Sequence, residues 1–167
     1  MLAGDPGQLD EATRYLEGTV RPHVEAQHGN RGLTCLVIEL WNAKDREGWM
    51  AGHDLHRLEA WAPGGLRLTG REAADTVWSM YNDAFPDNRI EIIAIHADDR
   101  GGVHEGHATG THTGPLRGPG GEIAATGKTA QVDFCEVYEF EEGKITSRHL
   151  YFDQAEMLAQ LGIEAGG

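Results

Sequence analysis

Two side chains in the second half of the chain, His112 and Glu136, have the types of an acid/base pair. His112 lies near the end of a segment expected to form one strand, and Glu136 lies in a later segment expected to form a facing strand. An imidazole and a carboxyl group beside an apolar pocket can transfer protons near neutral pH. The two residues therefore predict a small-molecule site on a curved sheet.

Glu136 stands out because of the strand face on which it lies. Apolar side chains dominate that face of the expected strand 129–140, whose members are Val132, Phe134, Glu136, Tyr138 and Phe140. A carboxylate within an apolar face is costly unless it is paired, and such groups often mark functional sites. Two interpretations stay open: Glu136 is a catalytic acid or base, or it forms a structural ion pair with Arg148.

His112 has small residues beside it on its own strand face. Alternation along the expected strand 103–113 places Gly106, Ala108 and Gly110 there. These small side chains leave room for a packed helix or for a ligand. His112 is therefore either a functional group or a hydrogen-bonded, inert core histidine.

The remaining histidines do not predict a metal site. His104 and His107 are three residues apart in an expected strand, so their side chains point to opposite faces. His53 and His56 lack a third ligand, and zinc sites need three or four convergent ligands. We expect neither a metal nor an organic cofactor, because proton transfer needs neither.

The periodicity predicts helices first and strands later. Three- and four-residue steps of apolar residues predict amphipathic helices at 33–41 and 74–85, with a short helical piece ending near 50. Residues 55–61 look extended. Alternation predicts strands over 89–97, 103–113, 129–140 and 144–152. A C-terminal helix capped by Asp153 is expected to follow the last strand. The glycine-rich segment 114–121 is expected to be a loop. This order predicts an α+β fold with helices on one face of an antiparallel sheet.

The candidate pocket lining is mostly aromatic. Trp61 and Tyr81 are expected near cleft-facing ends of their elements, and the full set of expected substrate-binding residues is Trp41, Glu59, Trp61, Tyr81, Phe134 and Leu150.

Length and charge narrow the class of protein. The 167 residues suit one domain at 33–167, preceded by an extension at 1–32 that we expect to be helical and to end in a turn at 29–32. With 27 acidic and 14 basic residues, the chain would repel nucleic acid and anionic membranes. It has no apolar run near the roughly 18 residues of a membrane span and no signal-peptide pattern at its start. We therefore expect a cytoplasmic protein.

Six short motifs, in order, resemble those of the SnoaL-like polyketide cyclases, which belong to the nuclear-transport-factor-2-like superfamily. They are Gly-Arg-Glu-Ala at 70–73, Ala-Phe-Pro-Asp at 84–87, Gly-Thr-His-Thr-Gly at 110–114, Ala-Thr-Gly-Lys at 125–128, Gly-Lys-Ile at 143–145 and Gln-Leu-Gly at 160–162. The resemblance covers roughly residues 33–163. It implies a cone-shaped barrel, in which a strongly curved antiparallel sheet wraps around N-terminal helices and a deep apolar pocket. It also implies a homodimer formed through the outer sheet face.

The same resemblance bears on the site. His112 matches the histidine that assists an intramolecular aldol closure in the cyclases. Gly127 occupies the place of their acid/base aspartate, and Trp61 falls near the place of a pocket asparagine. The superfamily also resembles limonene-epoxide hydrolases, but Leu150 stands at the approximate place of one of their aspartates.

Our leading hypothesis is a cofactor-free enzyme that cyclises or isomerises a hydrophobic, polyketide-like molecule. His112 and Glu136 would move protons, while Tyr138 and Arg148 would orient Glu136 or stabilise an oxyanion. The alternatives are a non-catalytic binding or dimeric accessory module, which the missing aspartate favours, and an epoxide-opening enzyme with a different acid/base set.

Overall fold

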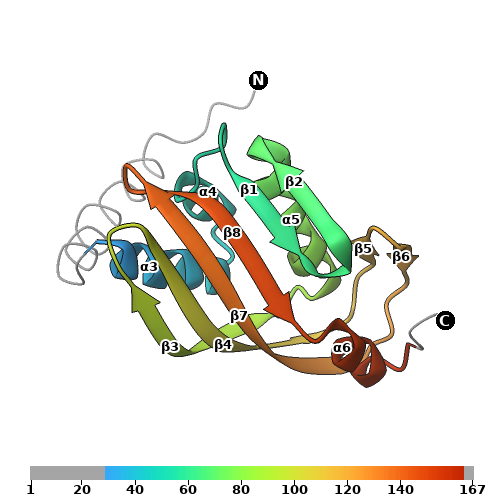
Figure 1. The fold of residues 1–167 in the computed structure, drawn as a ribbon. Helices are drawn as coiled ribbons and strands as arrows, with labels where there is room; N and C mark the ends of the chain where they lie inside the picture. Colours follow the sequence, from blue (N-terminus) through green and yellow to red (C-terminus); the bar gives the residue numbers. More distant parts are fainter. Residues whose placement is uncertain (1–28, 164–167) are drawn as a thin grey trace, which may run out of the picture.

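The computed structural model describes residues 29–163 (Figure 1). The helix expected near the N-terminus falls in residues 1–28, outside the described residues. Within the described part, no helix is both long and apolar enough to cross a bilayer.

Within residues 29–163, four α-helices frame the sheet. They are α3 (Asn30–Asn42), α4 (Arg46–Ala51), α5 (Gly70–Ala84) and α6 (Gln154–Gln160). Asp45 and Asp153 cap α4 and α6, each accepting a hydrogen bond from a backbone N–H three residues later. The amphipathic helices and the capped C-terminal helix predicted from the sequence are thus confirmed.

Six strands form one curved sheet in the order β2-β1-β8-β7-β4-β3. Their bounds are Glu59–Ala62 (β1), Leu66–Thr69 (β2), Arg89–Ala97 (β3), Gly101–Thr111 (β4), Thr129–Glu141 (β7) and Lys144–Phe152 (β8). All neighbours are antiparallel except β1 and β8, which run parallel. The two edge strands, β2 and β3, do not pair with each other. The predicted cone of a curved sheet around helices is therefore present, and the sheet is open.

Three tryptophans join the helices on the concave face of the sheet. Trp41 of α3, Trp49 of α4 and Trp78 of α5 lie with ring centroids 5.1–5.5 Å apart, in tilted or edge-on pairs. Such aromatic contacts add to the burial of the large rings themselves. Figure 1 shows α3, α4 and α5 together on one side of the sheet, with α6 at the end reached by β8. The cluster fixes one wall of the space between helices and sheet.

The turn predicted at 29–32 is wrong, because α3 begins at Asn30. Gly29, with φ of 63°, provides the left-handed entry that glycine allows. Asn30 Nδ2 donates to the Asp98 carbonyl at 2.7 Å, and Arg31 Nη1 donates to the Ile95 carbonyl at 2.8 Å. These distant contacts hold the first turn of the helix against β3, so polar residues that favour turns locally are helical here.

Two further expectations need correction. Residues 114–121 are not all loop, because β5 (Leu116–Gly118) pairs with β6 (Gly121–Ile123) in a short hairpin. Leu116 anchors this hairpin in an apolar cluster with Phe85 and Leu161. The extended segment predicted at 55–61 begins only at Glu59, since residues before it form turns.

The segment after β4 passes so close to α5 that only glycine fits at position 114. A Cβ atom there would lie 2.0 Å from the Asp83 carbonyl oxygen, whereas a Cβ at Gly120 would have no atom within 4 Å. Gly114→Ala should therefore lower the free energy of unfolding by about 1–3 kcal/mol, as overpacking does. Gly120→Ala is the matched control and should leave it unchanged. Urea unfolding of the two variants and the wild type measures the difference, and equal midpoints would contradict this packing.

Candidate active site

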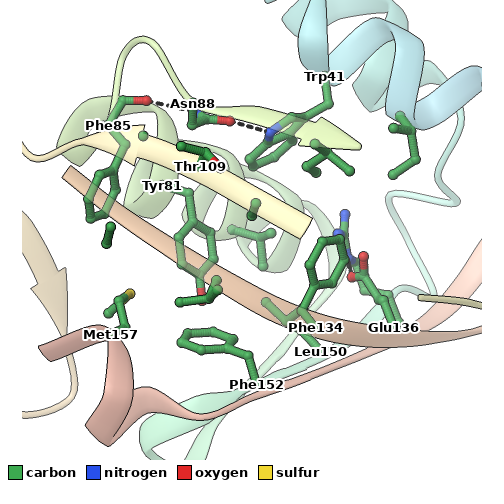
Figure 2. A pocket seen from close by; sticks show the side chains of 18 of the residues that line it. Trp41, Tyr81, Phe85, Asn88, Thr109, Phe134, Glu136, Leu150, Phe152 and Met157 are labelled. Atoms are coloured by element: carbon green, nitrogen blue, oxygen red, sulfur yellow. Dashed lines mark hydrogen bonds and ion pairs between the residues drawn. The ribbon is translucent and has the colours of Figure 1, made fainter. Parts of the chain in front are cut away.

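A cavity lies between the helices and the concave face of the sheet. It comprises about 800 Å³ of space free of protein atoms, part of it open to solvent. Most of its wall is apolar and aromatic, and its main contributors are Trp41, Tyr81, Phe85, Phe134, Leu150 and Phe152. Figure 2 shows these side chains around the hollow, together with the less numerous polar ones.

A buried ion pair forms one part of the wall. The Arg148 guanidinium lies against Glu136 Oε1, at 2.7 Å from Nε and 2.5 Å from Nη2. The Tyr138 hydroxyl donates to the other carboxylate oxygen, Oε2, at 2.7 Å. Alternation along β7 places Glu136 and Tyr138 on one face, and Arg148 lies opposite Tyr138 on β8. The ion pair that the sequence left open is present, and a catalytic role for Glu136 stays a prediction.

The arginine keeps its charge inside the protein. Burial alone would lower the pKa of Arg148, but the Glu136 carboxylate beside it outweighs burial and holds that pKa above its usual value. The guanidinium carbon also lies 4.8 Å from the centre of the Trp49 ring. This cation–π contact adds a second attraction that needs no further polar group.

His53 is a further hydrogen-bond partner of Arg148. Its Nδ1 lies 2.8 Å from the Trp49 carbonyl oxygen, which can only accept, so Nδ1 carries the proton. Its Nε2 then accepts from Arg148 Nη1 at 3.2 Å. Burial, followed by the positive charge of Arg148, lowers the pKa of His53 to about 3. His53 is therefore a neutral acceptor over the physiological pH range.

Tyr81 brings a hydroxyl group to the same cavity (Figure 2). Among the residues that the structure describes, none forms a hydrogen bond with this hydroxyl. Burial, reinforced by the Glu136 carboxylate, holds the pKa of Tyr81 well above its usual value. Tyr81 therefore stays protonated and can donate a hydrogen bond to an oxygen atom of a ligand.

Asn88 lies at another part of the wall, and its polar atoms are occupied. Its Oδ1 accepts from Trp41 Nε1 at 2.5 Å, and its Nδ2 donates to the Phe85 carbonyl at 2.7 Å and to Asn82 Oδ1 at 2.9 Å. The contacts with Trp41 and Phe85 are drawn in Figure 2. Asn88 thus fixes two aromatic walls of the cavity.

The predicted placement of His112 and Glu136 as a pair at one pocket is wrong. The residue opposite Glu136 on β4 is His104, and Thr111 pairs with Thr129. His112 follows the end of β4, about eight residues or roughly 25 Å further along the chain direction. It is buried against Phe85, with its Nδ1 accepting from the Thr126 N–H at 3.3 Å. The residues that line the cavity do not include it.

Two expected pocket residues lie on the other side of the sheet. Burial alternates along β1, so Glu59 and Trp61 face outward and Ala60 and Ala62 face inward. Trp61 stacks on His149 with ring centroids 3.8 Å apart. The other four expected binding residues, Trp41, Tyr81, Phe134 and Leu150, do line the cavity.

Sequence reasoning missed His53, Asn88 and the placement of His104. His104 is fully buried, stacks on the Tyr138 ring at 5.5 Å, and has no hydrogen-bond partner for either ring nitrogen among the described residues. His104 lies directly opposite Glu136 on the neighbouring strand, so both side chains are on the same face of the sheet. Alternation along β4 gives the face of His104, but its position beside Glu136 follows only from the register of the two strands. No group of three or more His, Cys, Asp and Glu side chains in the described part could hold a metal ion.

The lowered pKa of His53 makes folding sensitive to acid. An unfolded histidine titrates near pH 6.5, so between about pH 6 and pH 4 the unfolded chain binds one more proton at this residue than the folded chain. Stability therefore falls as the pH is lowered through this window, by about 1.4 kcal/mol per pH unit from His53 alone. Urea unfolding at several pH values should show a steeper acid loss for the wild type than for His53→Gln. Parallel curves would contradict a neutral His53 in the fold.

Solved structures with the same fold are distant in sequence. A candidate SnoaL-like polyketide cyclase from Jannaschia sp. CCS1 is 16% identical, with a TM-score of 0.68 and 81% of this chain and 91% of that chain covered. A candidate polyketide cyclase from Xanthomonas campestris is 20% identical, with a TM-score of 0.67 and coverages of 86% and 99%. An LEH-like epoxide hydrolase from M. tuberculosis is 21% identical, with a TM-score of 0.58 and coverages of 77% and 86%.

At these identities the likeness shows the fold alone. No curated protein matches the chain. The family model described as SnoaL-like polyketide cyclase matches residues 33–161, which includes all of the strands and most of the helical wall of the cavity. The chain therefore belongs to the SnoaL-like polyketide cyclase family.

Proposed function

We propose that the protein is a cofactor-free enzyme that transfers a proton on an apolar, carbonyl-bearing small molecule and so cyclises or isomerises it in the cytoplasm. The observation that carries the proposal is the placement of two groups in one apolar cavity. Glu136 is a carboxylate held by fixed donors, and Tyr81 is a protonated hydroxyl without a partner among the described residues. A proton acceptor and a hydrogen-bond donor at one hollow can act on two atoms of one substrate.

The reaction would begin with proton abstraction. Glu136 Oε2 accepts one hydrogen bond from Tyr138 and keeps a lone pair for a proton from a carbon beside a substrate carbonyl. The C–H electron pair becomes the enolate, whose oxygen accepts a hydrogen bond from Tyr81. In a cyclisation, the enolate carbon forms a bond to a second carbonyl carbon, and the oxygen of that carbonyl takes the proton back from Glu136. In an isomerisation, another carbon of the enolate system takes that proton back. Polyketide-like molecules suit this chemistry, since a carbon between two carbonyls loses a proton easily.

Arg148 fits this scheme as an electrostatic group. It holds the Glu136 carboxyl in place through the ion pair and adds positive charge near a developing enolate. His112 has no part in the proposed step, because it lies away from Glu136.

One observation favours a non-catalytic binding module as the second candidate. Both oxygens of Glu136 already have protein donors, Arg148 and Tyr138, which is the arrangement of a purely structural ion pair. An epoxide-opening enzyme is less supported, because Glu136 is the one carboxyl residue among the described residues that line the cavity.

Substitution of Glu136 separates the first two candidates. In D₂O, the wild type should catalyse deuterium uptake at the carbon beside the carbonyl of apolar ketones with one to three rings, followed by NMR. Glu136→Gln should lower the rate by about 10²-fold or more, as loss of a general base does. Glu139→Gln is the matched control, since Glu139 lies on the same strand with its side chain exposed.

Circular dichroism must first show that Glu136→Gln is folded, because it leaves Arg148 without its charge partner. A folded Glu136→Gln variant with the wild-type rate would remove Glu136 from the mechanism. Binding of these ketones without any deuterium uptake would favour the binding module.

We also propose that the protein forms a homodimer through the outer face of the sheet. Large apolar side chains are exposed there, with Trp61 and Val137 each 37% and Tyr151 51% accessible. Val137 and Tyr151 lie on the neighbouring strands β7 and β8, and exposed apolar groups that cluster mark interfaces. Light scattering should give the mass of a dimer for the wild type and of a monomer for Val137→Glu. A monomeric wild type at micromolar concentration would contradict this interface.

A further inference from the structure

The Arg148 guanidinium has donors left over after its protein contacts. A guanidinium carries five N–H groups. Glu136 Oε1 accepts a hydrogen bond from Nε and lies 2.5 Å from Nη2 in the ion pair, and His53 Nε2 accepts from Nη1. Even with one N–H of Nη2 assigned to the ion pair, one N–H on each of Nη1 and Nη2 is not used by these partners. Arg148 belongs to the residues that line the cavity, so a bound molecule can reach its guanidinium.

The orientation of these unused N–H groups depends on His53. Glu136 alone would leave Nη1 without a fixed acceptor. His53 supplies that acceptor, with its Nε2 at 3.2 Å from Nη1. With Glu136 on Nε and His53 on Nη1, contacts at two separate positions restrict rotation of the guanidinium plane.

His53 is itself held firmly. Its Nδ1 bonds to the Trp49 carbonyl, its ring lies 4.2 Å from the Trp49 ring, and its backbone forms a bridge to Ile145 at the start of β8. The backbone of Gly52 and Asp54 on either side also bonds to Ile145. Arg148 lies three residues further along the same strand. The acceptor and the arginine are thus tied to one piece of backbone.

We propose that His53 is a positioning residue that fixes the Arg148 guanidinium, so that its two remaining N–H groups face the oxygen of a substrate that becomes an enolate. This inference rests on the proposed function for the identity of that oxygen. The positioning itself needs no substrate. The structure therefore allows the two to be tested separately.

The state of His53 in the ligand-free protein tests the positioning. Nitrogen-15 NMR of the wild type should show the tautomer with the proton on Nδ1, unchanged down to about pH 4, and a slowly exchanging Arg148 Nε–H. A His53 ring protonated on Nε2 at neutral pH would overturn the proposal, because that nitrogen could not accept from Arg148.

Two substitutions of His53 distinguish the effect of its hydrogen-bond acceptor from the effect of its ring packing against Trp49. His53→Phe keeps a ring beside Trp49 but removes the acceptor, so the Arg148 Nε–H should exchange with water at least about tenfold faster. His53→Gln retains an acceptor and should restore most of the protection. His107→Gln, on the outer face of the sheet and half-exposed, is the control for loss of a histidine. If His53→Phe does not fold, the tautomer of His53 in the wild type still tests whether its Nε2 accepts a hydrogen bond from Arg148.

The ketone exchange assay then gives the catalytic readout. In His53→Phe the value of kcat should fall about tenfold or more with little change in KM, and His53→Gln should recover most of it. Equal Arg148 exchange in folded His53→Phe and wild type would overturn the proposal, as would equal loss in both His53 variants. Absence of turnover in every protein, with the expected NMR signals, would instead count against the proposed function alone.

Discussion

The site depends on placing a charged pair inside a largely apolar wall. Removing an arginine and a carboxylate from water costs several kcal/mol per ion, and their attraction offsets this only with good geometry and satisfied hydrogen bonds. Arg148 and Glu136 meet that condition through Tyr138 on the carboxylate and through His53 and Trp49 on the guanidinium. Because the partners come from β7, β8 and the end of α4, the pair also joins sheet and helices at the cavity.

This arrangement has two consequences for the proposed chemistry. Fixed donors hold Glu136 in one position, which suits a preorganised site. The same donors already contact both oxygens of the carboxyl group, so a substrate proton would have to reach a remaining lone pair. The proposed reaction therefore depends on how a substrate is oriented in the cavity as well as on the groups that line it.

The elements of the fold could be predicted from local pattern, but contacts between them could not. Periodicity located the main helices and the four long strands, because each buries one face along its length. The predicted partnership of His112 with Glu136 was wrong because alternation gives the face of a residue but not the register of its strand. Trp61 was misplaced because β1 is too short to show which of its faces is buried.

His53 illustrates a harder limit. Nothing in its neighbourhood along the chain indicates a bond to Arg148, since the contact arises only where the end of α4 meets β8. By contrast, Glu136 could be recognised from the sequence as a carboxyl residue on an otherwise apolar strand face, and Arg148 could be proposed as its ion-pair partner. Polar residues within an apolar pattern can thus be found from sequence, whereas the groups that satisfy them depend on the tertiary fold.

The cluster of three tryptophans has an optical consequence. Trp41 and Trp49 line the cavity, and their rings contact each other and Trp78, so excitation can pass among all three indoles. Trp61, on the outer face and partly in water, emits from a different environment. The protein thus carries an intrinsic fluorophore at the wall of its hollow, with blue-shifted emission that an entering conjugated molecule would quench.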